Sequence, residues 1–204
     1  MTENVVRQTV KVTRADRQRL NGHKGICLWL TGMSGAGKST IANAIEQSLH
    51  AQGVRTYLLD GDNLRLGLNQ DLGFTEEDRQ ENVRRVAHVA NLFVDAGVVV
   101  LAALISPFQA DRATARQLFD DDSFVEIHVN CPVEVCEARD PKGLYRKAKA
   151  GLIQKFTGVS SPYVIPLHAE ITLNTSTSTV DACVSEVIAY LEHQSQLMYR
   201  GIRS

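Results

Sequence analysis

Short apolar runs alternate with longer segments of helical periodicity along this chain. Five strands are expected where β-branched and apolar residues gather, at residues 26–31, 54–59, 98–105, 124–129 and 171–174. Helices are expected where apolar residues recur every three or four positions, over 38–50, 75–96, 111–119 and 180–193, and in a short segment from Pro132. Thr75 should cap the long helix, with Asp78 completing a capping box. This alternation predicts an α/β fold of three layers, a central parallel sheet with helices on both faces.

The length of 204 residues suits a single domain. We assign residues 1–21 to an N-terminal extension and residues 22–204 to that domain. Residues 139–161 are rich in Lys, Arg and Gly and only weakly periodic, which is typical of a mobile lid; a solvated basic loop is the alternative. Ligands of parallel sheets bind beyond the carboxyl ends of the strands, so the site is expected there.

Composition adds a few constraints. The 22 Lys and Arg residues against 23 Asp and Glu give a formal net charge of −1, which favours neither nucleic acid nor a membrane surface as a partner. The first 13 residues are polar and no apolar run is long enough to span a bilayer, so we expect a cytoplasmic protein. The cysteines lack a CxxC spacing and should be free, buried thiols; they are Cys27, Cys131, Cys136 and Cys183.

A glycine-rich motif follows the first predicted strand. Residues 32–39 match G-x-x-x-x-G-K-[ST] at every fixed position, which predicts a P-loop for ATP rather than a turn without a ligand. The glycines let backbone N–H groups converge on phosphate, and the next helix adds its positive dipole end. Lys38 should contact the β- and γ-phosphates, and Ser39 should bind Mg²⁺. The expected ATP contacts here are Gly32, Met33, Ser34, Gly35, Ala36, Gly37, Lys38, Ser39 and Thr40.

The motif predicts the nucleotide and leaves the acceptor open. The Asn-Lys-x-Asp segment of Ras-like GTPases is missing, and the third predicted strand runs into Ser106-Pro107 rather than the Asp of a motor-type ATPase. A kinase of small molecules fits best. A kinase-like module that only senses nucleotides is the alternative, and the intact Lys38, Ser39 and Asp62 argue against it.

Carboxylates and arginines follow the second predicted strand. A kinase acting on an alcohol needs a carboxylate to orient or deprotonate the hydroxyl, and Asp62 is the first candidate with Asp60 in support. The alternative is a helix N-cap and a solvated turn, in which Asp62 and Asn63 cap the next helix. Further on, Arg79, Asn82 and Arg85 recur at three-residue spacing and share one helix face. Arginine forks suit phosphate or sulfate, although a solvated face paired with nearby glutamates is the alternative.

Several longer motifs resemble the adenylylsulfate kinase family. They are LDGDNLR at 59–65, DLGFT at 71–75, DRQENVRR at 78–85, LISP at 104–107, CEARDPKGLY at 136–145 and FTG at 156–158. The resemblance implies a P-loop kinase fold and transfer of the γ-phosphate of ATP, with Mg²⁺, to the 3′-hydroxyl of adenosine 5′-phosphosulfate. The product would be the 3′-phosphoadenylyl sulfate of sulfate assimilation. A related kinase with another small acceptor, such as a nucleoside monophosphate or a sugar, is the alternative.

The same resemblance implies roles for individual residues. Phe74 and Phe156 would sandwich the acceptor's adenine, while Arg65, Arg79 and Asn82 would hold its phosphosulfate and ribose. Lys142 would lie in a lid that closes over ATP. The other expected contacts are Arg139 with ATP, and Asp62, Arg85, Ile105, Ser106 and Lys142 with the acceptor.

Ser106 joins Lys38, Asp60 and Asp62 as a catalytic candidate because members of the family have been described with a phosphoserine there. Direct in-line transfer needs no covalent step, so a simple contact with the substrate is the alternative. The chain departs from the family pattern at Gln109, where Arg is common, and at 159–164, where acidic residues are missing. The resemblance also implies a homodimer and leaves room for a functional link to ATP sulfurylase.

Overall fold

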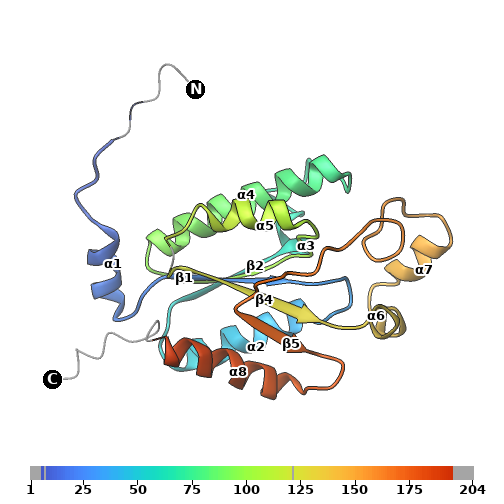
Figure 1. Cartoon of the computed structure of the whole chain (residues 1–204). Coiled ribbons are helices and arrows are strands. Elements are labelled where there is room, and N and C mark those ends of the chain that lie inside the picture. Colours follow the sequence, from blue (N-terminus) through green and yellow to red (C-terminus); the bar gives the residue numbers. More distant parts are fainter. Residues whose placement is uncertain (1–5, 7, 121, 195–204) are drawn as a thin grey trace.

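A parallel five-stranded sheet organises the part of the chain that the computed structural model describes, residues 6, 8–120 and 122–194 (Figure 1). Its strands are β1 (Ile26–Thr31), β2 (Thr56–Asp60), β3 (Val99–Ala103), β4 (Phe124–Asn130) and β5 (Ile171–Asn174), in the order β2-β3-β1-β4-β5. The helices of these residues are α1 (Arg14–Asn21), α2 (Lys38–Ala51), α3 (Gly61–Leu64), α4 (Glu76–Asp95), α5 (Gln109–Arg116), α6 (Val133–Arg139), α7 (Leu144–Lys149) and α8 (Val180–His193).

Two apolar clusters cover the two faces of the sheet. Helices α2 and α8 lie on one face, and α4 and α5 lie on the other (Figure 1). Side chains alternate along a strand, so Leu28 and Leu30 of β1 pack toward α2 and α8, while Trp29 packs toward α4 and α5. All of β1 is buried, which explains its continuous apolar sequence. The predicted three-layer α/β fold is confirmed.

The strand register brings three carboxyl ends together. Ala103 of β3 is paired with Leu30 of β1 on one side and with Asp60 of β2 on the other. The glycine-rich turn after β1, the acidic segment after β2 and the loop after β3 therefore leave the sheet at one edge. This is the edge where the sequence pattern predicted the site.

The boundaries of several elements differ from the predicted ones. Strand β3 ends at Ala103, and residues 104–107 form a loop; α5 begins at Gln109, two residues earlier than expected. The segment predicted as a lid contains α7, which is too short to show helical periodicity in the sequence. At α4 the Thr75 hydroxyl accepts from the Asp78 amide at 3.2 Å. The Asp78 carboxylate lies against Gly73 instead, so only half of the predicted capping box forms.

Helix α1 was not predicted. It begins with a complete capping box between Thr13 and Asp16. The Arg14 guanidinium then donates to the Asp120 carboxylate at 2.6 Å and to the Ser123 hydroxyl at 2.7 Å. These contacts tie this part of the assigned extension to the rest of the domain. Across the described residues, none of the helices has the length and apolar character needed to cross a membrane.

Candidate active site

The glycine-rich turn between β1 and α2 has room only for glycine at its critical positions. Gly35 and Gly37 have φ angles of 76° and 100°, in the left-handed region. A Cβ at Gly35 would also stand 2.8 Å from the Cys136 carbonyl oxygen. The turn leads directly into the N-terminus of α2, whose free N–H groups and dipole favour an anion. The predicted phosphate-binding geometry is thus built into the backbone.

Lys38 lies over this turn. Its ammonium donates to the carbonyl oxygens of Gly32 at 2.9 Å and Met33 at 2.8 Å. Burial lowers the pKa of Lys38 to about 8, because an ammonium loses hydration there without gaining a directly paired carboxylate. The charge is therefore available to a phosphate group bound in the turn.

Ser39 and Asp60 bring hard oxygen atoms together beside the turn. The Ser39 hydroxyl donates to Asp60 Oδ2 at 2.6 Å. The other oxygen, Oδ1, accepts from the amides of Asp62 and Asn63. The residue that caps α3 is therefore Asp60, and not Asp62 or Asn63 as the alternative interpretation expected. This donor set fits Mg²⁺, which takes one or two protein oxygens and completes its shell with phosphates and water. Within the described residues, no cluster of three or more His, Cys, Asp or Glu side chains could hold a metal alone.

The predicted lid reaches the acidic segment. Lys142 Nζ donates to Asp62 Oδ2, joining the segment before α7 to the end of β2. Arg139, at the end of α6, donates to the Thr175 carbonyl at 2.6 Å and approaches the Gly35 carbonyl at 3.4 Å. Of the two basic residues expected near ATP, Arg139 therefore lies beside the glycine-rich turn, and Lys142 lies beside the Asp62 carboxylate.

Three residues that the sequence predicted to contact the acceptor, Arg65, Phe74 and Arg79, lie together, and we call this region the predicted acceptor side. The guanidinium carbons of Arg65 and Arg79 are 4.4 Å and 5.7 Å from the centre of the Phe74 ring. Arg65 is held by the carbonyl oxygens of Leu72 and Gly73, both at 2.9 Å. Burial lowers the pKa of both guanidiniums, which remain cations because their ordinary pKa is so high. The arrangement places two positive charges over an exposed aromatic ring.

The three residues that recur at three-residue spacing on α4, Arg79, Asn82 and Arg85, lie in two different environments. Arg79 and Asn82 are 8% and 7% exposed, so the solvated-face interpretation is wrong for these two residues. Arg85 instead forms ion pairs with Asp71 at 2.7 Å and Glu81 at 2.8 Å. These pairs occupy its guanidinium, and a contact between Arg85 and the acceptor stays a prediction without geometric support.

The two phenylalanines predicted to sandwich a purine lie in different environments. Phe74 is 56% exposed, whereas Phe156 is buried and packs edge-on against Tyr145, with ring centres 5.0 Å apart. The Lys155 carbonyl nevertheless accepts from Arg79 at 3.3 Å, so the Phe156 segment adjoins the acceptor side. A sandwich needs Phe156 to leave its packing position, and it stays a prediction.

Ser106 is buried in the loop after β3. Its hydroxyl accepts from the Trp29 indole at 3.1 Å, and its φ angle of 37° is unusual for a residue with a side chain. The indole is a donor and cannot act as a base, so the surroundings favour a positioning contact over a covalent intermediate. The neighbouring Ile105 carbonyl accepts from the Thr31 hydroxyl at 2.7 Å.

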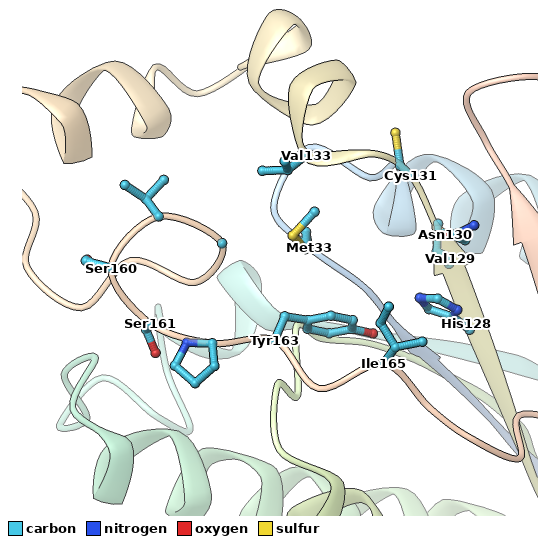
Figure 2. A pocket seen from close by; sticks show the side chains of 13 residues that line it. Met33, His128, Val129, Asn130, Cys131, Val133, Ser160, Ser161, Tyr163 and Ile165 are labelled. Carbon is cyan, nitrogen blue, oxygen red and sulfur yellow. The ribbon is translucent and has the colours of Figure 1, made fainter.

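A cavity of about 560 Å³ lies between the end of β4 and residues 158–165. Figure 2 shows Met33 and Val133 on one side of it and Ser160, Ser161 and Tyr163 on the other. Of the predicted site residues only Met33 lines it, so it adjoins the glycine-rich turn but is not the acceptor side just described. The cavity was not predicted because its walls come from three segments that are distant in the sequence: the glycine-rich turn, residues 128–133 and residues 158–165. The four cysteines are free and buried, as predicted.

Comparisons with known proteins agree with this geometry. A family model described as adenylylsulphate kinase matches residues 24–174. The adenylyl-sulfate kinase of Marinobacter nauticus is 55% identical over 94% of this chain and 96% of its own length. That of Clostridium acetobutylicum is 53% identical over 95% of this chain and 96% of its own.

A solved structure, the APS kinase of Mycobacterium tuberculosis in complex with AMPPNP and APS, superimposes with a TM-score of 0.81 at 47% identity. The alignment covers 83% of this chain and 99% of that one. A sugar kinase from Janibacter, 18% identical with a TM-score of 0.55, shares the fold alone. From the motifs, the geometry and these matches together, the chain belongs to the adenylylsulphate kinase family.

Proposed function

We propose that this protein transfers the γ-phosphate of ATP to the 3′-hydroxyl of adenosine 5′-phosphosulfate, giving 3′-phosphoadenylyl sulfate and ADP. The observation that carries the proposal is the placement of Arg65 and Arg79 around the Phe74 ring. A purine can stack on the ring while the guanidiniums hold the phosphosulfate, so the face suits an anionic purine nucleotide. Membership of the family supports the same substrate pair.

On the donor side, the backbone amides of the glycine-rich turn and the Lys38 ammonium would hold the ATP phosphates. Ser39 and Asp60 would hold Mg²⁺, which, when bound, neutralises charge on the phosphates. Arg139 lies beside Gly35 and Thr175, where it can contact the nucleotide. The chain's own contribution is to fix the triphosphate and exclude water around it.

On the acceptor side, Asp62 would accept a hydrogen bond, and then the proton, from the attacking hydroxyl. Its carboxylate is exposed at the end of β2, two residues from the Asp60 contact with Ser39. Lys142 holds this carboxylate from the lid segment, so the position of the lid and the orientation of the base are linked.

The expected cytoplasmic location, homodimer and link to ATP sulfurylase are also part of this proposal. Free, buried thiols at all four cysteines suit a reducing compartment. The homodimer and the sulfurylase link rest on the family resemblance, and sedimentation of the purified protein, alone and with a sulfurylase, measures both.

The proposed reaction is tested with a panel of acceptors. Purified protein, ATP and Mg²⁺ are incubated with adenosine 5′-phosphosulfate, AMP or gluconate, and ADP release is measured. We expect turnover with the sulfated nucleotide and a kcat/KM for AMP at least about 100-fold lower, because AMP lacks the sulfate that the arginines pair with. Turnover with AMP or gluconate alone would reject the proposal.

The Lys38 pKa predicts that ATP binding depends on pH. Because burial lowers this pKa to about 8, the Lys38 ammonium loses its proton as the pH rises through that value. The phosphate-binding turn then lacks the positive charge of Lys38. ATP affinity should therefore fall about tenfold between pH 7 and pH 9. Calorimetry on the wild type and Lys38→Arg measures this, since the Arg variant stays charged. Equal pH dependence in both proteins would contradict the assignment.

The role of Asp62 predicts a loss of turnover without a loss of ATP binding. Asp62→Asn should lower kcat by about 10²- to 10⁴-fold, because the amide cannot accept the hydroxyl proton, while the Kd for ATP changes by less than about twofold. Asp120→Asn, an exposed acid paired with Arg14 far from the site, is the matched control. Parallel losses in kcat and ATP affinity would show that Asp62 acts structurally.

The guanidinium fork of Arg79 predicts a selective effect on the acceptor. Arg79→Lys should raise the acceptor KM about tenfold, because a point charge cannot replace a planar fork beside Phe74. Arg84→Lys is the control: Arg84 lies on the same helix, is exposed, and pairs with Glu81 alone among the residues that the structure describes. If both variants keep the wild-type KM, Arg79 does not belong to the acceptor site.

A further inference from the structure

A buried arginine joins the loop after β3 to residues 163–164, which directly follow the lid segment 139–161. Arg112 of α5 is 1% exposed, and each of its guanidinium nitrogens has an acceptor. Nε donates to the Glu126 carboxylate at 2.6 Å, and Nη1 donates to the Ser106 carbonyl at 2.8 Å. Nη2 donates to the Gln109 side chain at 2.7 Å and to the Val164 carbonyl at 2.9 Å. One side chain thus fixes three segments that are distant in sequence.

Two further contacts hold the same segments together. The Val164 amide donates to the Pro107 carbonyl at 2.9 Å. The Thr31 hydroxyl donates to the Ile105 carbonyl at 2.7 Å and lies 3.1 Å from the Tyr163 hydroxyl. Residues 163–164 are therefore fastened to residues 105–107, and we name this set of contacts, with Arg112, the clamp.

The clamp stabilises an unfavourable backbone conformation at Ser106. Ser106 has a φ angle of 37°, which is costly for a residue with a Cβ and is retained only where the surroundings fix it. Its carbonyl is fixed by Arg112, and its hydroxyl is fixed by the Trp29 indole. Loss of the Arg112 bond would let the peptide after Ser106 rotate.

The charge of Arg112 is balanced without help from the substrates. Glu126 is 5% exposed and is the ion-pair partner of Arg112. The second oxygen of Glu126 lies 3.7 Å from Arg116, which pairs with Glu170 at 2.7 Å on the outer side. Arg116 shares the helix and the carboxylate with Arg112, yet its hydrogen bonds go to Phe124 and Glu170 and not to the clamped segments. It provides a matched control.

We propose that Arg112 is a positioning residue for the acceptor. It holds the loop of Ile105 and Ser106 and residues 163–164, which follow the lid, in one arrangement, so that the acceptor side is complete only while the clamp is formed. Its hydrogen bonds reach none of the residues of the glycine-rich turn, so the donor side does not depend on it. The identity of the acceptor rests on the proposed function; the clamp itself does not.

The test compares Arg112→Lys with Arg116→Lys in the full chain. A lysine keeps a charge for Glu126 but cannot reach the Ser106 and Val164 carbonyls at once. Arg112→Lys should raise the KM for adenosine 5′-phosphosulfate about tenfold and change the Kd for ATP by less than about twofold. Trp29 is the chain's single tryptophan and bonds Ser106, so its fluorescence emission should shift in this variant. Arg116→Lys should leave all three readouts unchanged.

A second variant guards against misfolding of the first. Thr31→Val keeps the shape of the buried side chain and removes the hydroxyl that joins Ile105 to Tyr163. It should move the acceptor KM and the Trp29 emission in the same direction, by about threefold for KM.

The outcomes separate the inference from the proposed function. The inference is overturned if Arg112→Lys folds and keeps the wild-type acceptor KM and Trp29 emission. It is also overturned if this variant loses acceptor binding and ATP binding to the same extent. If Arg112→Lys does not fold, Thr31→Val decides by the same criteria. If the wild type does not phosphorylate adenosine 5′-phosphosulfate, the proposed function fails. In that case the Trp29 emission still tests whether the clamp exists. A shift in Arg112→Lys but not in Arg116→Lys supports the clamp, and the absence of a shift in Arg112→Lys rejects it.

Discussion

The hydrogen bond between the Ser39 hydroxyl and the Asp60 carboxylate joins the two halves of this site. Ser39 belongs to the helix after β1 and Asp60 to the end of β2, and β3 lies between these strands. The contact can form only because the parallel register brings the three strands to an end at the same height. A shift of β2 by one residue would turn the Asp60 side chain to the other face of the sheet and separate it from Ser39, the other proposed Mg²⁺ ligand.

Basic residues of the site lie in two groups, one on each side of this contact. Lys38 and Arg139 lie on the phosphate side, and Arg65 and Arg79 lie on the acceptor side around Phe74. The carboxylates of Asp60 and Asp62 lie at the junction between them. In the proposed reaction, each of the two anionic substrates would be neutralised by its own set of cations, and the carboxylates would direct the hydroxyl between them.

Much of this arrangement could be predicted from local sequence. The glycine-rich turn is a contiguous motif whose backbone geometry follows from its glycines. The buried strand β1 can be recognised in the sequence as an unbroken apolar run. The acidic segment after β2 was placed correctly because parallel strands end at one edge. Helices α1 and α7 escaped prediction. The sequence of α1 is almost entirely polar and so has no apolar period, and α7 has six residues, too few to show one.

The contacts that escaped prediction are those between distant segments. Arg112 shares its helix with the charged Asp111 and Arg116, and nothing in the local sequence sets it apart from them. Only the fold shows that Ser106, Glu126 and Val164 meet it. Arg85 shares the spacing of Arg79, yet the loop before α4 supplies Asp71 as its partner. Periodicity identifies the face of a helix, whereas the segment packed against that face decides whether a cation meets substrate or a carboxylate.

The regiochemistry of the reaction tests the central claim most directly. The wild-type protein is incubated with ATP, Mg²⁺ and adenosine 5′-phosphosulfate, and the purified product is analysed by phosphorus–proton NMR correlation. The account predicts a new phosphate coupled to the ribose 3′ proton, with the phosphosulfate intact and one ADP formed per product. ADP release without phosphorylation of the nucleotide, or a phosphate at another position, would contradict it.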